Sequence, residues 1–300
     1  MERRHSRTLV IAVLSLAFAG SAQAQDAAKG ASLLAEARTA LGGEDKLRAV
    51  KTLEVKSDFK RAAGQNTLEG EMEIRIERPG KMRRDEDLSL PGGGPAIVRT
   101  EVLNGANVWD ENSGSAGFGG FGRGGGRGFG GGGGRDRAGQ AAGAPPAARA
   151  IDPAQLEEFQ RRTRLADLSR FNLMWLLDTD APVAWVGTAE SPDGKADVLE
   201  IRAAEGMPMR LFLEQGSHMP LMVTWQGPAG AGLRGRGGDQ APQQASPPPT
   251  LRITLGEYKA VDGIKLPHLI TRGANGRTIE EWIVKSYKLN PSFKSDVFNK

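Results

Sequence analysis

Two dipeptides near the end of this 300-residue chain, Asp262-Gly263 and Asn275-Gly276, constrain its fold more than any other feature. Each one separates apolar runs, and Asp-Gly or Asn-Gly in that setting is the strongest short-range signal for a two-residue β-hairpin. The pair therefore predicts three consecutive antiparallel strands, at 251–258, 265–271 and 278–287.

Similar patterns recur upstream and predict more strands than helices. The further strands are expected at 52–60, 67–77, 81–90, 96–103, 183–188, 197–203, 210–214 and 221–225. The helices are expected at 27–41, at 44–50, from Asp152 and Pro153 onward, and separately at 169–177. Consecutive hairpins with few helices predict an α+β fold built on one large antiparallel sheet.

Two segments have compositions that cannot pack. Of the 23 residues at 113–135, 14 are glycine, and 227–249 is rich in Gly, Pro and Gln. Such sequences bury little apolar surface and cannot offset the entropy lost on ordering. We therefore expect one domain at 25–300 that carries mobile insertions at 111–150 and 227–249.

The N-terminus has the layout of a secretory signal peptide. Arginines precede an apolar run at 9–19, and Ala22-Gln23-Ala24 is a small-x-small cleavage site. The run is too short to span a bilayer. Arg3-Arg4 also occurs in twin-arginine signals, but the residues after this pair favour the general secretory route. We expect cleavage after Ala24 and a location in the periplasm, with the cell exterior as the second choice.

Composition excludes several classes of function. The chain has no cysteine, which excludes disulfides, thiol catalysis, cysteine metal sites and lipidation at an N-terminal cysteine. Removal of residues 1–24 would leave 37 basic and 35 acidic residues, mixed along the chain. This balance does not indicate a protein that binds polyanions.

Candidate catalytic residues are few. His218 and His268 lack carboxylates at the spacing of a metal site or a catalytic triad. Asp178 and Asp180 could act as paired carboxylates, but a helix end explains them equally well. The chain has no glycine-rich phosphate loop with Lys-Ser/Thr. We therefore expect no catalytic residue, no metal and no cofactor, and a protein that is not an enzyme.

The glycine-rich segment at 118–135 carries arginine and phenylalanine in a pattern that indicates nucleic-acid binding in cytosolic proteins. Because an exported protein does not meet nucleic acid, we exclude that partner and interpret the segment as a mobile loop. A second interpretation stays open, in which Arg123, Arg127 and Arg135 contact an anionic membrane surface. Each such charge contributes about 1 kcal/mol.

Several short motifs follow one another in a fixed order. They are a helix ending in Gly42-Gly43, Leu47-Arg48-Ala49-Val50, Pro79-x-Lys81-x-Arg83, Asn107-Val108-Trp109, Gly187, Arg210-Leu211-Phe212-Leu213, Met219-Pro220, Tyr258, Asp262-Gly263-Ile264-Lys265-Leu266-Pro267 and Asn290-x-x-Phe293. This order resembles the outer-membrane lipoprotein carrier and sorting superfamily over most of 26–298, apart from the two insertions. The chain departs from that family at 214–217, where relatives often carry an Asp and a Thr.

The resemblance implies an incomplete β-barrel, a strongly curved antiparallel sheet of about eleven strands with helices covering the concave face. It also implies that an apolar ligand is held between sheet and helices. The side chains expected to line this groove are Met72, Met174, Trp175, Trp185, Phe212, Met222 and Trp225. Methionine adapts to varied apolar shapes. The alternative for each residue is an ordinary place in the core.

The sequence thus predicts a periplasmic, monomeric carrier that binds a hydrophobic ligand or a lipidated protein, through lipoprotein acyl chains or lipid. The alternative is a periplasmic sensor or scaffold that uses the same sheet to bind a protein partner. Neither function requires catalysis.

Overall fold

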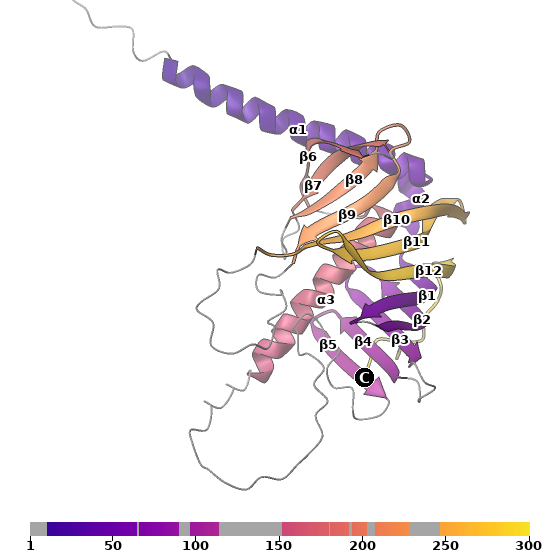
Figure 1. The fold of residues 1–300 in the computed structure, drawn as a ribbon. Coiled ribbons are helices and arrows are strands. Elements are labelled where there is room, and N and C mark those ends of the chain that lie inside the picture. Colours follow the sequence, from indigo (N-terminus) through magenta and orange to yellow (C-terminus); the bar gives the residue numbers. More distant parts are fainter. Residues whose placement is uncertain are drawn as a thin grey trace, which may run out of the picture.

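The computed structural model of the protein places residues 11–64, 66–89, 97–113, 152–179, 181–191, 194–202, 208–227 and 247–300. Within these residues the chain forms one antiparallel sheet of twelve strands, together with three helices (Figure 1). The prediction of one large antiparallel sheet is confirmed, with twelve strands rather than about eleven.

Eleven of the twelve strands lie within a few residues of the predicted ranges, and β5 has no predicted range. Their bounds are β1 Thr52–Ala63, β2 Asn66–Glu77, β3 Lys81–Ser89, β4 Ile97–Asn104, β5 Asn107–Ser113, β6 Val183–Ser191, β7 Gly194–Ile201, β8 Met209–Glu214, β9 Pro220–Gln226, β10 Thr250–Val261, β11 Ile264–Ala274 and β12 Arg277–Leu289.

The two strongest hairpin signals form the predicted turns. Asp262 and Gly263 have φ angles of 49° and 79°, and Asn275 and Gly276 have φ angles of 47° and 82°. Two successive positive φ values are the mark of a type I′ turn, whose twist matches that of the flanking strands. Strands β10, β11 and β12 are therefore consecutive hairpin partners, as predicted.

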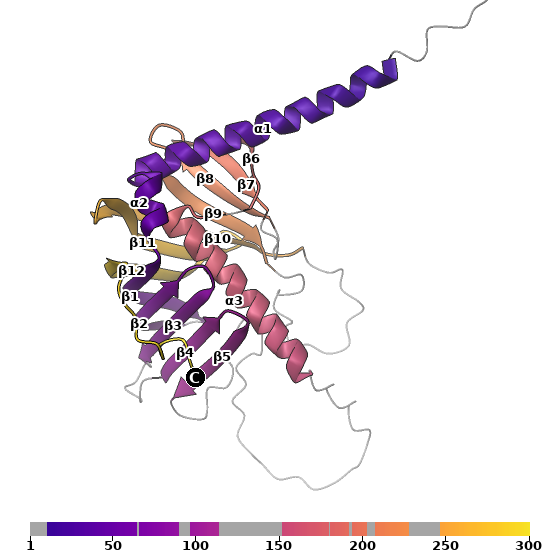
Figure 2. The same ribbon diagram turned by 180° about the vertical axis from the view of Figure 1, so that it is seen from behind.

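The strand order is β5-β4-β3-β2-β1-β12-β11-β10-β9-β8-β7-β6. In the middle of the sheet β1 pairs with β12, so that Leu53 lies opposite Leu289 and Phe59 opposite Trp282. The edges are β5 and β6, which follow each other in the sequence. The segment that connects them includes α3 (Pro153–Leu176), which runs across one face of the sheet (Figure 2).

α3 is one continuous helix. The Asp152 carboxylate accepts a hydrogen bond of 3.0 Å from the Ala154 N–H, and Pro153 is the first helical residue, as predicted. The expectation of a separate helix at 169–177 is wrong. No glycine or proline interrupts the chain between Pro153 and the helix end, so nothing in the backbone ends the first helix early.

α1 (Ile11–Leu41) and α2 (Glu44–Ala49) precede the sheet. α1 was expected to begin at residue 27, but the helix starts at Ile11, inside the segment interpreted as a signal peptide. Small and apolar residues at 11–24 allow the helix to continue without a break. The helix ends at Gly42, as expected, where φ is 137°.

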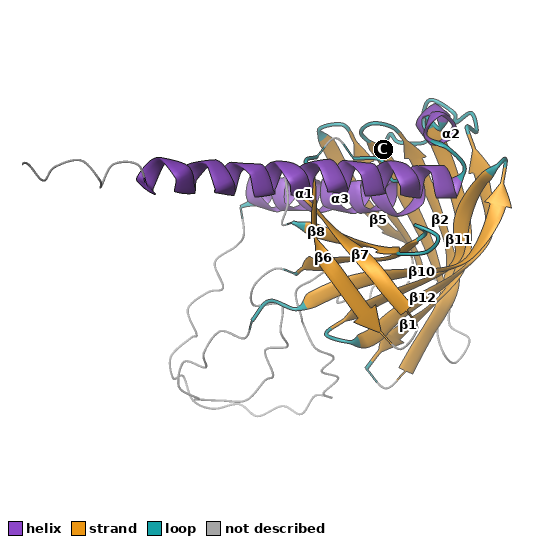
Figure 3. Cartoon of the chain, turned by 90° about the horizontal axis from the view of Figure 1, so that it is seen from above, coloured by secondary structure: helices purple, strands orange, loops and turns teal. Residues whose placement is uncertain are grey.

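α1 and α3 lie on the same face of the sheet, which we call the helix face; the opposite side is the outer face (Figure 3). α1 crosses β6 closely at Gly30, where an added Cβ would lie 2.8 Å from the backbone nitrogen of Trp185. α3 contacts β3, β4, β5 and β9.

The core lies between the helices and the helix face. In β2, Met72, Ile74 and Ile76 are buried and the residues between them are charged, because alternate side chains of a strand point to opposite faces. The helices contribute Leu33, Leu34, Ala37 and Leu41 from α1 and Leu168, Phe171, Leu173, Met174, Trp175 and Leu176 from α3.

Most of the predicted insertions lie outside the residues that the structure describes, and so do Arg123, Arg127 and Arg135. Residues 111–113 belong to β5 rather than to an insertion. The ends of the second insertion meet, because the Gly227 N–H donates a 2.7 Å hydrogen bond to the Pro249 carbonyl. None of the helices in the described ranges is both long and apolar enough to cross a membrane.

Candidate functional site

An aromatic cluster fills the space beneath α3. Phe171 stacks on Trp175 with ring centroids 5.1 Å apart, and its ring lies 6.1 Å from that of Trp282 in β12. Trp175 meets Tyr287 edge-on at 6.3 Å. Trp175 and Trp282 have no exposed surface. The protein's own side chains therefore occupy this part of the interior, as in any close-packed core.

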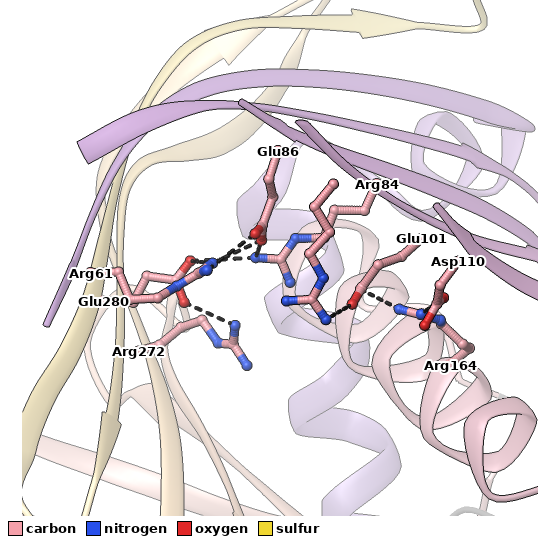
Figure 4. A network of polar contacts seen from close by, with 9 residues as sticks. Arg61, Arg84, Glu86, Glu101, Asp110, Arg164, Arg272 and Glu280 are labelled. Carbon is pink, nitrogen blue, oxygen red and sulfur yellow. Dashed lines mark hydrogen bonds and ion pairs between the residues drawn. The ribbon is translucent and has the colours of Figure 1, made fainter. Parts of the chain in front are cut away.

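A network of charged side chains lies on the helix face (Figure 4). It adjoins the aromatic cluster, because Arg84 and Arg272 lie 5.6 and 5.8 Å from the ring centroid of Trp282. Arg61 of β1 donates hydrogen bonds to Glu86 of β3 at 2.8 Å and to Glu280 of β12 at 3.1 Å. Arg84 pairs with the same two carboxylates, and Arg272 of β11 donates to Glu280 at 3.1 Å. The network thus joins four strands through buried ion pairs.

The two carboxylates of this network stay ionised. Burial by itself raises the pKa of Glu86, but Arg84 and Arg61 outweigh that effect and hold the pKa at about 2. Burial also opposes ionisation of Glu280, whose pKa is nevertheless held at about 2 by Arg272, Arg84 and Arg61. Groups with such pKa values are poor acids and bases near pH 7. The network is suited to joining strands, not to proton transfer.

A second group of ion pairs holds the middle of α3 on the sheet. Arg164 has no exposed surface and pairs with Glu101 of β4 and Asp110 of β5 (Figure 4). Arg99 of β4 also pairs with Glu101. Because a buried arginine needs carboxylate partners, these contacts fix the helix at one position on the sheet.

The C-terminal end of α3 is held as well. Arg38 of α1 donates hydrogen bonds of 3.0 and 3.3 Å to the carbonyl of Leu177, the residue that ends the helix. A cation at a helix C-terminus is stabilised by the helix dipole. Asp178 follows and pairs with Arg78 of the β2–β3 connection.

A pocket of about 610 Å³ lies along the C-terminal half of α3. This volume is in the range of small-molecule sites, about 300–1,000 Å³. Its apolar lining comes from α3, the β2–β3 turn, the segment before β6 and the start of β8: Leu165, Leu168, Leu173, Pro79, Ala181, Pro182 and Met209.

Polar and charged groups complete the pocket. Lys51, Arg78 and Arg202 are its cations, and Asp178 is its carboxylate among the residues that the structure describes. Asn172 also lines the pocket, and its Oδ1 atom is buried without a hydrogen-bond partner in the described part of the chain. The pocket therefore combines an apolar wall with a mainly cationic border.

The seven predicted groove residues lie elsewhere, and none of them lines this pocket. Met72, Met174, Trp175 and Trp225 are buried in the core on the helix face. Trp185 of β6 is half-buried beneath the Lys29 ammonium of α1, which lies 3.4 Å from the ring centroid.

Phe212 and Met222 pair with each other across β8 and β9. Their neighbours Leu211 and Val223 face the core, so Phe212 and Met222 face the outer side of the sheet. The structure thus brings four of the seven residues together in the core and leaves two on the opposite face.

The titratable residues weighed in the sequence lie in structural contacts. His218 pairs with Glu36 of α1 at 3.2 Å, and His268 forms a 3.0 Å hydrogen bond with the Leu266 carbonyl. Asp178 follows the end of α3, and Asp180 lies outside the described residues. In the ranges that the structure covers, no three His, Asp or Glu side chains come close enough to hold a metal ion.

Sequence reasoning missed the buried charges, although a signal was available. Residues 83–87 of β3 are five consecutive charged residues. Alternate residues of a strand face opposite sides, so Arg84 and Glu86 share one face whichever way the strand is turned. A strand inside a sheet covered by helices must then bury charge, and such charge needs partners.

Searches of protein-family models and of curated proteins found no match. Among solved structures, a LolA superfamily protein from Nitrosomonas europaea matches with 11% identity and a TM-score of 0.49, covering 90% of this chain and 97% of that one. A putative outer membrane lipoprotein-sorting protein domain from Vibrio parahaemolyticus matches with 10% identity and a TM-score of 0.45, covering 91% and 97%. A DUF1329 family protein from Desulfovibrio piger matches with 8% identity and a TM-score of 0.45, covering 90% and 96%. The chain is structurally similar to these three proteins.

Proposed function

We propose that the protein binds a hydrophobic or lipidated ligand, and that an acyl chain of this ligand occupies the pocket along α3. The observation that carries the proposal is the pocket itself, about 610 Å³ in volume and walled by Leu165, Leu168 and Leu173 of α3. A concave site of this size with an apolar lining and a few polar groups is the usual form of a small-molecule pocket. This pocket replaces the groove that we expected from the sequence.

The energetics favour a ligand with a long chain. Transfer of each CH₂ group from water to an apolar site releases about 0.8 kcal/mol. A C12 chain that is fully buried would contribute roughly 10 kcal/mol before the costs of association are subtracted. Such a ligand requires neither a metal nor a cofactor for binding.

We also propose that the sheet curves around α3 as an incomplete barrel. Arg164 pairs with Glu101 of β4, and Arg170 lies over the Trp225 ring of β9, 4.3 Å from its centroid. Six residues of a helix span about 9 Å. Seven strand spacings, from β4 to β9, amount to about 33 Å in a flat sheet. A flat sheet would place these strands too far apart for both contacts, which supports curvature.

We propose a periplasmic location and a single domain at 25–300, on the strength of the signal-peptide pattern at 1–24. In the part of α1 whose side chains are described, the buried residues begin at Gly30. Cleavage after Ala24 would therefore leave the packed part of α1 intact. N-terminal sequencing of the exported protein tests this: a mature N-terminus at Gln25 supports export, and an N-terminus at residue 1 opposes it.

We propose binding rather than catalysis as the activity. Glu86 and Glu280, the two carboxylates of the charged network, form ion pairs with arginines. Their pKa values of about 2 make them poor proton carriers near pH 7. Asp178, the carboxylate that lines the pocket, pairs with Arg78.

The second candidate is a sensor or scaffold that binds a protein partner. Leu156 and Phe159 of α3 favour it, because they are 44% and 55% exposed and lie three residues apart on one side of the helix. Exposed apolar side chains of this size are common at protein interfaces.

Titration of the purified protein with dodecanol, a neutral C12 chain, tests the proposed function by calorimetry. We expect saturable binding at one site per chain. A Ser169→Trp variant places a large side chain in the pocket from a partly exposed position, so binding should weaken at least about tenfold.

The matched control is Arg162→Trp, on the same helix but outside the pocket lining, where the side chain is 68% exposed. This variant should bind dodecanol as the unmodified protein does. Absence of saturable binding, or equal binding by both tryptophan variants, would contradict an acyl-chain site in this pocket and leave the scaffold as the better candidate.

A further inference from the structure

We infer that the ligand of the pocket along α3 carries an anionic head group, held by Lys51, Arg78 and Arg202 while its chain lies on the apolar wall. This inference rests on the proposed function and specifies the chemical class of ligand: an acyl chain that ends in a carboxylate or a phosphate.

Lys51 and Arg78 form one side of the pocket's border. The two residues are neighbours in space, because the Arg78 N–H donates a 2.9 Å hydrogen bond to the Lys51 carbonyl. The Lys51 ammonium donates to the Arg48 carbonyl at 3.0 Å and has no carboxylate partner in the described part of the chain. Its charge is therefore available to an anion.

The guanidinium of Arg78 has a fixed position. One nitrogen donates to the Val50 carbonyl at 2.8 Å, and another pairs with Asp178. A guanidinium has five N–H donors, so these contacts leave others for a ligand oxygen. Arg78 is thus already oriented, and binding would cost little of its side-chain entropy.

Arg202 lies at another part of the pocket's border, directly after β7. Its backbone N–H donates a 3.3 Å hydrogen bond to the Pro182 carbonyl. Its side chain pairs with Glu200 at 2.8 Å and is 77% exposed. Glu200 also has Arg210 at 3.7 Å, so one carboxylate serves two arginines.

The charges do not cancel even when these outside partners are counted. Lys51, Arg78 and Arg202 supply three positive charges, and Asp178 and Glu200 supply two negative ones. A net charge of about +1 beside an apolar wall favours an anion, because the adjacent low-dielectric surface strengthens the attraction. A neutral chain would leave this charge without a partner.

The test compares the affinity of the full protein for three ligands by calorimetry at low salt. Dodecanol carries a neutral head, laurate a carboxylate on a chain of the same length, and lauroyl lysophosphatidylglycerol a phosphate. We expect laurate or the lysophospholipid to bind about tenfold more tightly than dodecanol, equivalent to about 1.4 kcal/mol. Whichever of the two binds more tightly identifies the head group.

The decisive variant is Lys51→Glu with Arg202→Glu, both at exposed positions, so that the fold is preserved. The preference for the anionic ligand should disappear or reverse, while dodecanol binding remains. The matched control is Arg48→Glu with Arg210→Glu, which changes the charge equally at exposed positions outside the pocket lining. This control should keep most of the preference.

Different results would contradict the acyl-chain pocket and the anionic head group. If dodecanol and the anionic ligands bind equally, or if both double variants lose the preference to the same extent, the inference about the head group is wrong and the acyl-chain pocket stands. If none of the three ligands binds, the proposed function is wrong, and the inference falls with it.

Discussion

Arg164 is a charged residue with no solvent exposure, buried between α3 and the sheet. Desolvation of an isolated guanidinium is very costly, so the position is tenable only because Glu101 and Asp110 lie against it. The same pairs would be worth little at the surface. At this scale the protein uses buried charge to fix where α3 lies, and apolar packing supplies most of the stability.

Arg164→Ala should therefore lower the free energy of unfolding by about 3–5 kcal/mol, because it removes one of the two arginines that pair with the buried Glu101 and leaves that carboxylate only Arg99. Arg162→Ala is the matched control. Arg162 lies on the same helix, is 68% exposed and pairs only with Glu158 among the described residues, so its loss should cost about 0–1 kcal/mol. Urea unfolding measures both values. Similar losses in the two variants would contradict the account of α3.

Acid should weaken the network of Glu86 and Glu280. Each has a folded-state pKa of about 2, below its ordinary value of 4.5, because of the arginines around it. A lowered pKa contributes stability that is fully present above about pH 5 and is lost as the pH falls toward 2. Glu280→Gln removes one of these groups, so its stability should fall less steeply between pH 5 and 2. An unchanged slope in urea unfolding across that range would count against these ion pairs.

At the scale of elements, the contact between α1 and β6 depends on the absence of a side chain at Gly30. An added Cβ at Gly30 would lie 2.8 Å from the Trp185 nitrogen and 2.9 Å from the Ala184 carbonyl carbon. Both are backbone atoms of β6 and cannot rotate away. The glycine thus allows the helix to lie directly against the edge strand, and Lys29 beside it covers the Trp185 ring.

Gly30→Leu should lower stability by about 1–3 kcal/mol through overpacking, despite the better helix propensity of leucine. Ala31→Leu is the control, since it places the same side chain on the exposed side of the same helix. Thermal unfolding should show a lower Tm for the first variant and little change for the second. A rise in Tm for Gly30→Leu would mean that α1 does not pack on β6 in this way.

The elements differ in how well the sequence predicts them. Asp262-Gly263 and Asn275-Gly276 determine their turns locally, so the last three strands could be predicted. The continuity of α3 could not, because Arg164, Asp167 and Arg170 interrupt its apolar pattern. Arg164 has its partners on β4 and β5, far away in the sequence, and local reasoning therefore split the helix.

At the scale of the whole molecule, the central pairing of β1 with β12 joins residues more than 200 positions apart, such as Leu53 and Leu289. Local propensity contains no information on such a pairing. The pocket along α3 was missed for the same reason. Its lining comes from parts of the chain as far apart as Lys51 and Met209, and α3 contributes the partly exposed Leu165 together with the buried Leu168 and Leu173.

The central proposal is that an acyl chain lies in the pocket along α3. Photo-crosslinking with a C16 fatty acid that carries a diazirine near the end of its chain, followed by mass spectrometry of tryptic peptides, tests it most directly. We predict that the label is concentrated in the peptide at 165–170, which contains Leu165, Leu168 and Ser169 of the pocket lining. Labelling concentrated instead at Phe212 and Met222 on the outer face, or no labelling that excess unmodified fatty acid can displace, would contradict the claim.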